Sequence, residues 1–183
     1  LSPGALYAYQ HAMCILFRRE EWQSLYARSI AFSKASKDKV ICHAVLILAG
    51  VIAMDLLSDS VGSNAAFEQA LKLVPNDTAP LELLVDNYID DPSRWRELDS
   101  ILKRLLDATD VPKKRLELTL LRAINFNVSC KSPDKALEIL GEIIRETPQE
   151  RIILEYYFEL LHQEGHVDEA MRISKHFAEL ASA

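Results

Sequence analysis

Two histidines near the C-terminus have a spacing that could hold a metal ion. His162 and His166 lie four residues apart, so one continuous helix would place both imidazoles on the same face. Gly165 lies between them, however, and favours a turn at this point. His176 and Glu169 are the nearest residues that could complete a ligand set. We therefore expect a helix end followed by a loop here, and no metal site.

The segment 57–68 has part of the pattern of a calcium-binding loop. Gly62 and Glu68 occupy the places of the loop glycine and of its last carboxylate. Leu57 and Val61, however, occupy places where such a loop needs oxygen ligands. We expect no calcium site in this segment.

Motifs of common catalytic centres are missing from the sequence. It contains no glycine-rich phosphate loop, no G-x-S-x-G nucleophile elbow and no H-E-x-x-H helix. Carboxylates are abundant, but no pair is isolated among apolar residues in a way that would shift a pKa usefully. We expect no catalytic residues, no cofactor and no enzymatic activity.

The three cysteines, Cys14, Cys42 and Cys130, are widely spaced, and each lies within an apolar helical pattern. No C-x-x-C pair is present, which argues against structural zinc. An odd number of separated cysteines is typical of buried thiols in a reducing compartment. The sequence thus predicts a cytoplasmic, intracellular protein.

Composition favours a helical protein without a nucleic-acid partner. Hydrophobic residues make up 49% of the 183 residues, while only 5 Gly and 7 Pro occur, too few for the turns of most sheet proteins. The 27 acidic and 21 basic residues give a net charge of −6, which does not attract phosphate backbones. The most apolar stretch, Val40 to Leu57, is too short and too interrupted for membrane insertion, so we expect a buried helix.

Proline marks a repeat along the chain. Pro75, Pro112 and Pro148 are 37 and 36 residues apart, and each follows an apolar-periodic run that reads as a helix. Two helical patterns fit into each interval, which predicts five antiparallel pairs in units of about 1–37, 38–75, 76–112, 113–148 and 149–183. The first residue is Leu1 rather than Met, so we expect a segment of a longer protein.

The repeat resembles the tetratricopeptide (TPR) repeat. The resemblance rests on residues at the places of the family's turn glycine, crossing alanine, second-helix apolar residues and closing proline. These residues are Phe67, Ala70, Leu71, Leu73 and Pro75 in the second unit, Ala136, Leu140, Ile143 and Pro148 in the fourth, and Gly165, Val167 and Ala170 in the fifth. The resemblance implies an all-α solenoid of about five antiparallel helix pairs, a TPR-like right-handed superhelix forming a single domain.

In that family the first helix of each pair lines a concave groove that binds proteins or peptides. Transferring this geometry places the following residues in the groove: Gln10, Cys14, Leu48, Ile52, Glu82, Asp86, Leu121, Asn125, Glu155 and Glu159. Leu48, Ile52 and Leu121 would form an apolar surface that accepts an amphipathic helix of a partner. The alternative for these three residues is burial in the core, because exposed apolar patches are uncommon.

A second candidate surface is acidic. Glu82, Asp86 and Asp90 are spaced by four residues and should share one helix face, and Glu155 and Glu159 repeat the arrangement. Like charges at this spacing destabilise a helix slightly, which a basic segment of a partner could offset. The alternative is a solvated face that maintains solubility.

These features predict a protein–protein interaction module, a scaffold or adaptor, that binds a partner protein or peptide. The alternative is a chaperone or regulatory sensor that captures an extended client segment, as small bacterial secretion chaperones with such repeats do. Neither function involves nucleic acid or membrane insertion.

Overall fold

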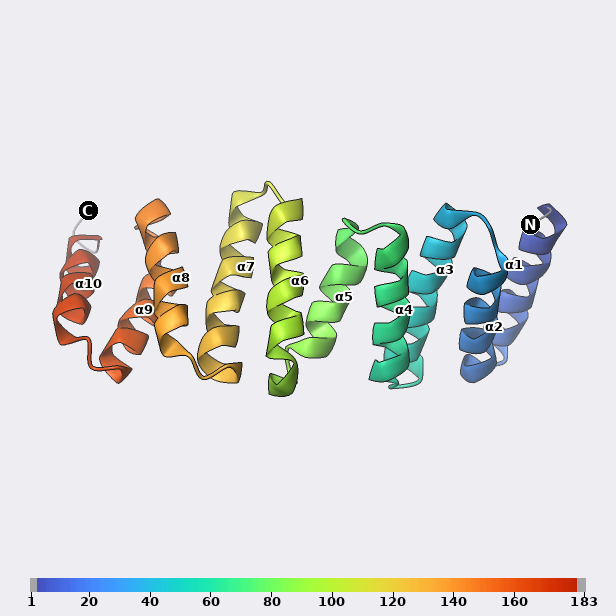
Figure 1. Ribbon diagram of the computed structural model, residues 1–183, viewed down its shortest axis with the longest axis horizontal. Helices are drawn as coiled ribbons and strands as arrows, with labels where there is room; N and C mark the ends of the chain where they lie inside the picture. Colours follow the sequence, from blue (N-terminus) through green and yellow to red (C-terminus); the bar gives the residue numbers. More distant parts are fainter. Residues whose placement is uncertain (1–2, 181–183) are drawn as a thin grey trace. The chain divides into compact units, whose positions relative to one another are not determined.

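The computed structural model describes residues 3–180 and, within them, ten α-helices without a β-strand. The helices, shown in Figure 1, are α1 (Pro3–Arg18), α2 (Trp22–Ala35), α3 (Lys39–Val51), α4 (Ser60–Leu73), α5 (Thr78–Tyr88), α6 (Trp95–Ala108), α7 (Pro112–Ile124), α8 (Pro133–Glu146), α9 (Arg151–Gln163) and α10 (Val167–Leu180). The predicted all-α class is confirmed, since 83% of the chain is helical. Residues 1–2 and 181–183, the ends of the first and fifth predicted units, lie outside the described residues.

The chain divides into two compact units, an N-terminal unit that ends at Asn87 and a C-terminal unit that begins at Tyr88. Successive helices pack as neighbours from α1 to α4 in the N-terminal unit and from α6 to α10 in the C-terminal unit. Short turns connect these neighbours, so each unit is a stack of antiparallel helices. The division falls inside the third predicted pair, residues 76–112, and the single domain of five pairs stays a prediction.

The core of the N-terminal unit joins its first three helices. Tyr9 and Met13 of α1 pack against Leu25 of α2 and Val45 of α3. A buried polar contact accompanies this packing, since the hydroxyl groups of Tyr9 and Ser29 lie 3.1 Å apart. The hydroxyl of Ser29 also donates to the carbonyl oxygen of Leu25, so no buried hydroxyl is left without a partner here.

Helices α3 and α4 come close together at Gly50. A Cβ atom at this position would lie only 2.3 Å from Cε1 of Phe67, whose side chain is fully buried. Ser63, on the same helix as Phe67, is also fully buried. The aromatic ring of α4 therefore packs where α3 has no side chain.

The segment 39–56, formed by α3 and the π-helical turn Ile52–Leu56, is apolar enough and long enough to cross a membrane by length and composition alone. Its mean hydropathy is 2.0, and 39% of it is buried inside the protein. The core helix of a folded domain meets the same criterion, and α3 packs between α2 and α4. The buried helix that we expect from the sequence is found only in part, since Val40 and Leu48 of α3 are 78% and 45% exposed.

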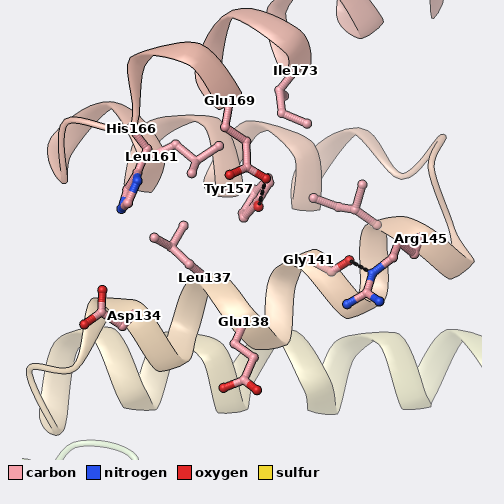
Figure 2. A pocket seen from close by; sticks show the side chains of 11 residues that line it. Asp134, Leu137, Glu138, Gly141, Arg145, Tyr157, Leu161, His166, Glu169 and Ile173 are labelled. Carbon is pink, nitrogen blue, oxygen red and sulfur yellow. Dashed lines mark hydrogen bonds between the residues drawn. The ribbon is translucent and has the colours of Figure 1, made fainter.

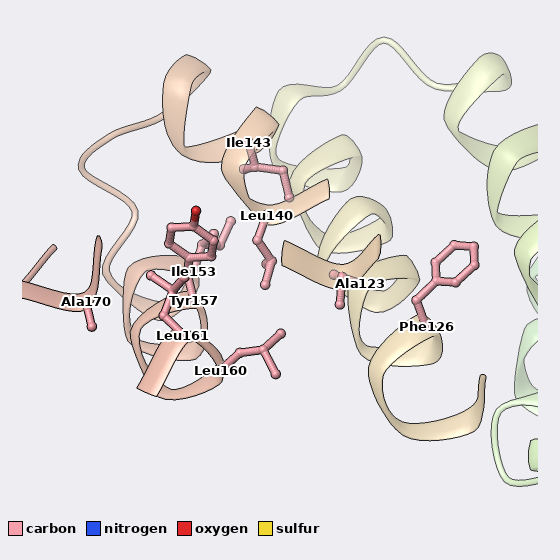
Figure 3. Close-up of a cluster of buried hydrophobic side chains, with 10 residues drawn as sticks. Ala123, Phe126, Leu140, Ile143, Ile153, Tyr157, Leu160, Leu161 and Ala170 are labelled. Atoms are coloured by element: carbon pink, nitrogen blue, oxygen red, sulfur yellow. The ribbon is translucent and has the colours of Figure 1, made fainter. Parts of the chain in front are cut away.

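The core of the C-terminal unit joins α7, α8, α9 and α10 (Figure 3). Its buried members are Ala123, Phe126, Ala136, Leu140, Ile143, Ile153, Tyr157, Leu160, Leu161 and Ala170. Ala136 and Ala170, the predicted crossing residues, are 0% and 5% exposed. Small side chains thus lie where the helices must come close, as the TPR resemblance implies.

Four turns within helix pairs share a left-handed residue. Glu20, Ser58, Lys131 and Gly165 have φ angles of 56°, 51°, 53° and 78°. The turns at Ser58 and Lys131 also follow π-helical segments, Ile52–Leu56 and Asn125–Ser129, in which the chain makes hydrogen bonds across five residues. The repeat is therefore visible in the backbone of the turns, although only the fifth pair uses the glycine that favours this conformation.

Candidate functional site

An apolar cavity of about 440 Å³ opens between α1 and α3 of the N-terminal unit, and we call it the α1/α3 cavity. It is lined by Met13, Cys14, Phe17, Arg18, Leu25, Leu48, Val51, Ile52, Asp55 and Leu56. Cys14, Leu48 and Ile52, three of the residues that the TPR geometry assigns to the groove, thus line one cavity.

Helical spacing explains why these side chains converge. Cys14 and Phe17 lie one turn apart on α1, and Leu48 and Ile52 lie one turn apart along α3 and the π-helical turn that follows. Leu56 continues the second row by one more turn. Two first helices of successive pairs therefore present facing rows of apolar side chains.

The α1/α3 cavity has a buried floor and an exposed rim. Met13, Leu25 and Ile52 form the floor and are at most 9% exposed. Phe17, Leu48 and Leu56 on the rim are 59%, 45% and 41% exposed, so large apolar side chains gather at the mouth of the cavity. The Phe17 ring makes an edge-on contact with the Trp22 ring, with 5.3 Å between the ring centroids.

A smaller cavity of about 380 Å³ lies between α7 and α9 of the C-terminal unit and is called the α7/α9 cavity. Leu116 and Leu120 of α7 face Ile152 and Ile153 of α9 across it. Ile152 is 70% exposed. Each unit therefore has an apolar cavity between first helices of successive predicted pairs.

Two of the residues assigned to the groove are buried instead. Ile52 is 3% exposed and forms part of the floor, so the expectation that it projects from the surface is wrong. Asn125 is also 3% exposed, and its Nδ2 donates to the carbonyl oxygen of Trp95 at 2.9 Å. Leu121 is half-buried in the C-terminal unit, where Leu120 lines the α7/α9 cavity. Leu121 itself does not line that cavity, and its place in a binding groove stays a prediction.

The cysteines differ from the predicted set of buried thiols. Cys42 is buried and Cys130 is half-buried, but Cys14 is exposed beside the α1/α3 cavity. The prediction of burial is therefore wrong for Cys14, because its helix face is left uncovered between α1 and α3.

The predicted acidic face is shorter than expected. Glu82 and Asp86 are exposed on α5, but this helix ends at Tyr88, so Asp90 lies in the following turn and not on the same helix face. Asp77, a further acidic residue just before α5, makes two contacts within the protein. Its Oδ1 accepts a hydrogen bond from the backbone N–H of Ala79, and its Oδ2 lies 3.0 Å from Nε2 of His43.

The second acidic pair has a partner in its own helix. Nε of Arg151 donates to Oε1 of Glu155 at 2.6 Å, so the charge of Glu155 is compensated one turn away. Glu159 is exposed on α9. A recognition role for the acidic residues stays a prediction.

The histidine pair lies at a helix end, as the sequence predicts. Helix α9 ends at Gln163, and Gly165 adopts a positive φ between His162 and His166. His176 instead places Nε2 2.7 Å from the carbonyl oxygen of Pro148. Within residues 3–180, no three His, Cys, Asp or Glu side chains gather as metal ligands would.

Comparison with known proteins relates the chain to a fold and not to a sequence family. No family model and no curated protein sequence matches it. Among solved structures, a MamA RS-1 double mutant matches with a TM-score of 0.60 at 14% identity, over 96% of this chain and 92% of that one. A MamA chain from Desulfovibrio magneticus RS-1 matches with a TM-score of 0.57 at 14% identity, over 96% and 93%.

A third similar structure, MamA MSR-1 C2, has a TM-score of 0.56 and 11% identity over 95% of each chain. MamA is a TPR-like helical protein, so the helical-repeat architecture that the sequence predicts agrees with these structures. At such identities the likeness concerns the fold.

Proposed function

We propose that the protein is a protein-interaction module, a scaffold or adaptor without catalytic activity, and that it binds an apolar helical segment of a partner in the α1/α3 cavity. The observation that carries this proposal is the open apolar cavity with its exposed rim of Phe17, Leu48 and Leu56. Likeness to TPR-like helical structures supports a binding function of this kind.

Physical considerations favour a helix as the occupant. Two facing helices separated by an apolar cavity offer the groove into which an amphipathic helix lays one face. A large apolar side chain that fills the cavity would cover Leu48 and Phe17 and remove their surface from water. Burying one such side chain contributes about 1.5–3 kcal/mol, enough to act as an anchor of the interface.

Replacing Leu48 by Glu tests the proposal. The tagged protein and the variant are purified from the native source, and the proteins that accompany each in stoichiometric amount are quantified by mass spectrometry. We expect the main partner of the wild-type protein to fall at least tenfold with Leu48→Glu, because a carboxylate on the rim must be desolvated when an apolar segment binds.

Val61→Glu is the matched control. Val61 is an exposed apolar residue of α4, 78% exposed, and does not line the α1/α3 cavity. The control should retain the partner, and circular dichroism should show both variants folded. Equal partner recovery with the wild-type protein and Leu48→Glu would refute the proposal.

The same measurement separates the chaperone alternative from the scaffold. A folded subunit of defined stoichiometry supports the scaffold or adaptor. A single client that is unfolded when isolated from the complex would instead support capture of an extended segment by a chaperone or regulatory sensor.

A further inference from the structure

A third cavity, of about 520 Å³, lies in the C-terminal unit where α8 and α10 flank α9, and we call it the α8/α10 cavity (Figure 2). It has more charged groups in its lining than the α1/α3 cavity, where Arg18 and Asp55 are the charged residues. Leu137, Leu161 and Ile173 supply apolar lining from the three helices. Three carboxylates, those of Asp134, Glu138 and Glu169, line it together with His166 and Arg145.

The polar groups in the middle of the α8/α10 cavity accept hydrogen bonds. The Tyr157 hydroxyl donates its proton to Oε1 of Glu169 at 2.7 Å, which leaves the lone pairs of the phenol oxygen as acceptors. Burial, and then the hydrogen bond and charge of Glu169, raise the pKa of the Tyr157 phenol above its ordinary value. The phenol therefore stays protonated at neutral pH and keeps its bond to the carboxylate.

The guanidinium in the lining, that of Arg145, makes a hydrogen bond within its own helix. Nε of Arg145 donates to the carbonyl oxygen of Gly141 at 3.1 Å, and Figure 2 shows this contact toward one end of the cavity, away from Asp134. Its charge still acts on Tyr157 and opposes the rise of the phenol pKa, but less strongly than burial and Glu169 raise it. Gly141 leaves space beside the phenol, since a Cβ atom there would meet only the Tyr157 oxygen, at 3.5 Å. The lining thus has three carboxylates against one guanidinium, together with apolar walls.

We propose that the α8/α10 cavity is a second interaction surface, which receives an arginine side chain from a basic, leucine-containing segment of a partner protein. The aliphatic part of the arginine lies along Leu137 and Ile173, and its guanidinium binds the carboxylate of Glu169. Charge complementarity selects this occupant, because a guanidinium donates several hydrogen bonds and accepts none, the reverse of what the cavity offers.

A short fluorescent peptide of alternating leucine and arginine is the probe, and fluorescence anisotropy at near-physiological salt measures its affinity. Glu169→Gln should weaken binding of this peptide at least tenfold, because the variant loses a charge-assisted hydrogen bond but keeps an oxygen that accepts from Tyr157. Gly141→Leu should weaken binding similarly, because the new side chain enters the cavity beside the phenol.

Asp168→Asn is the matched control, since it removes the same charge from the neighbouring position of α10, outside the cavity lining. It should change the affinity by less than about twofold if the contact is specific and not only a surface field. A peptide with glutamate in place of arginine should not bind.

Three results would overturn the inference. They are no binding of the arginine peptide to the wild-type protein, equal weakening by Glu169→Gln and Asp168→Asn, and loss of peptide binding in Leu48→Glu, which would assign the peptide to the α1/α3 cavity. The proposed function is tested with the native partner and not with this peptide, so failure of the peptide to bind leaves the proposed function standing, and recovery of the native partner with Leu48→Glu leaves this inference standing.

Discussion

Replacing Gly50 by Ala should lower the free energy of unfolding by about 3 kcal/mol, although the change adds a single methyl group. The new Cβ would lie 2.3 Å from a carbon atom of the Phe67 ring, which is fully buried. The ring or helix α4 must therefore shift, and contacts within a closely packed core weaken. Chemical denaturation followed by circular dichroism measures the loss.

Gly141→Ala is the matched control in α8. There the added Cβ would meet only the Tyr157 oxygen at 3.5 Å, an ordinary contact distance. Alanine has the higher helix propensity, so this variant should be more stable than the wild-type protein by about 0.5–1 kcal/mol. Similar changes in both variants would mean that helix propensity, and not the close approach of α3 and α4, decides the effect.

Replacing Asp99 by Asn should cost about 2–3 kcal/mol in the C-terminal unit, because a nearly buried guanidinium loses its counter-charge. Oδ1 of Asp99 accepts from Nε of Arg122 at 2.8 Å, and Oδ2 lies 2.7 Å from Nζ of Lys103. The side chains of Asp99 and Arg122 are 10% and 17% exposed, so water screens this pair poorly. Thermal or chemical unfolding of both proteins measures the cost.

The stability of the protein at acid pH should depend on the same interaction of Asp99 with Arg122 and Lys103. Burial alone would raise the pKa of the Asp99 carboxyl, but the hydrogen bonds and charges of Lys103 and Arg122 outweigh burial, so its pKa lies below the ordinary value. The stabilisation is therefore complete above the unfolded-state pKa of about 3.9 and is lost as pH falls through the lower folded-state pKa. Asp99→Asn should remove this part of the acid dependence.

Glu97→Gln serves as the control for both experiments, since the ion pair of Glu97 with Arg94, just before α6, has side chains 49% and 33% exposed and should contribute less than about 1 kcal/mol. If Asp99→Asn is as mild as Glu97→Gln, the buried pair does not stabilise the unit.

Helix positions could be predicted from the sequence because apolar periodicity and proline are local signals. Pro75 and Pro148, which mark the predicted repeat, follow the last residues of α4 and α8 by two positions. Side-chain exposure was harder to predict, since it depends on neighbouring helices that the local pattern does not reveal. Ile52 and Asn125 are buried by such neighbours, since Ile52 packs in the core with Met13 and Leu25 and Asn125 bonds to the backbone of Trp95.

The sequence pattern did not predict the exposed rim residues of the α1/α3 cavity, for a related reason. Phe17 and Leu56 read as parts of ordinary apolar stripes, and only the fold shows that no helix covers them. The position of Gly50 admits the Phe67 ring, which the sequence alone does not reveal. A signal was present in both cases, since Phe17 lies one turn from Cys14, and Gly50 lies one turn from Leu46 in the part of α3 that is apolar from Ala44 onward.

The most direct measurement of the central claim, that a partner occupies the α1/α3 cavity, uses the native thiol of Cys14. This exposed cysteine lines the cavity, whereas the half-buried Cys130 belongs to the other unit and is the internal control. Alkylation by iodoacetamide is followed by mass spectrometry in the free protein and in the complex with its partner. We predict that the partner slows modification of Cys14 at least tenfold and leaves the rate at Cys130 unchanged, whereas equal rates at Cys14 in the free protein and the complex would contradict the claim.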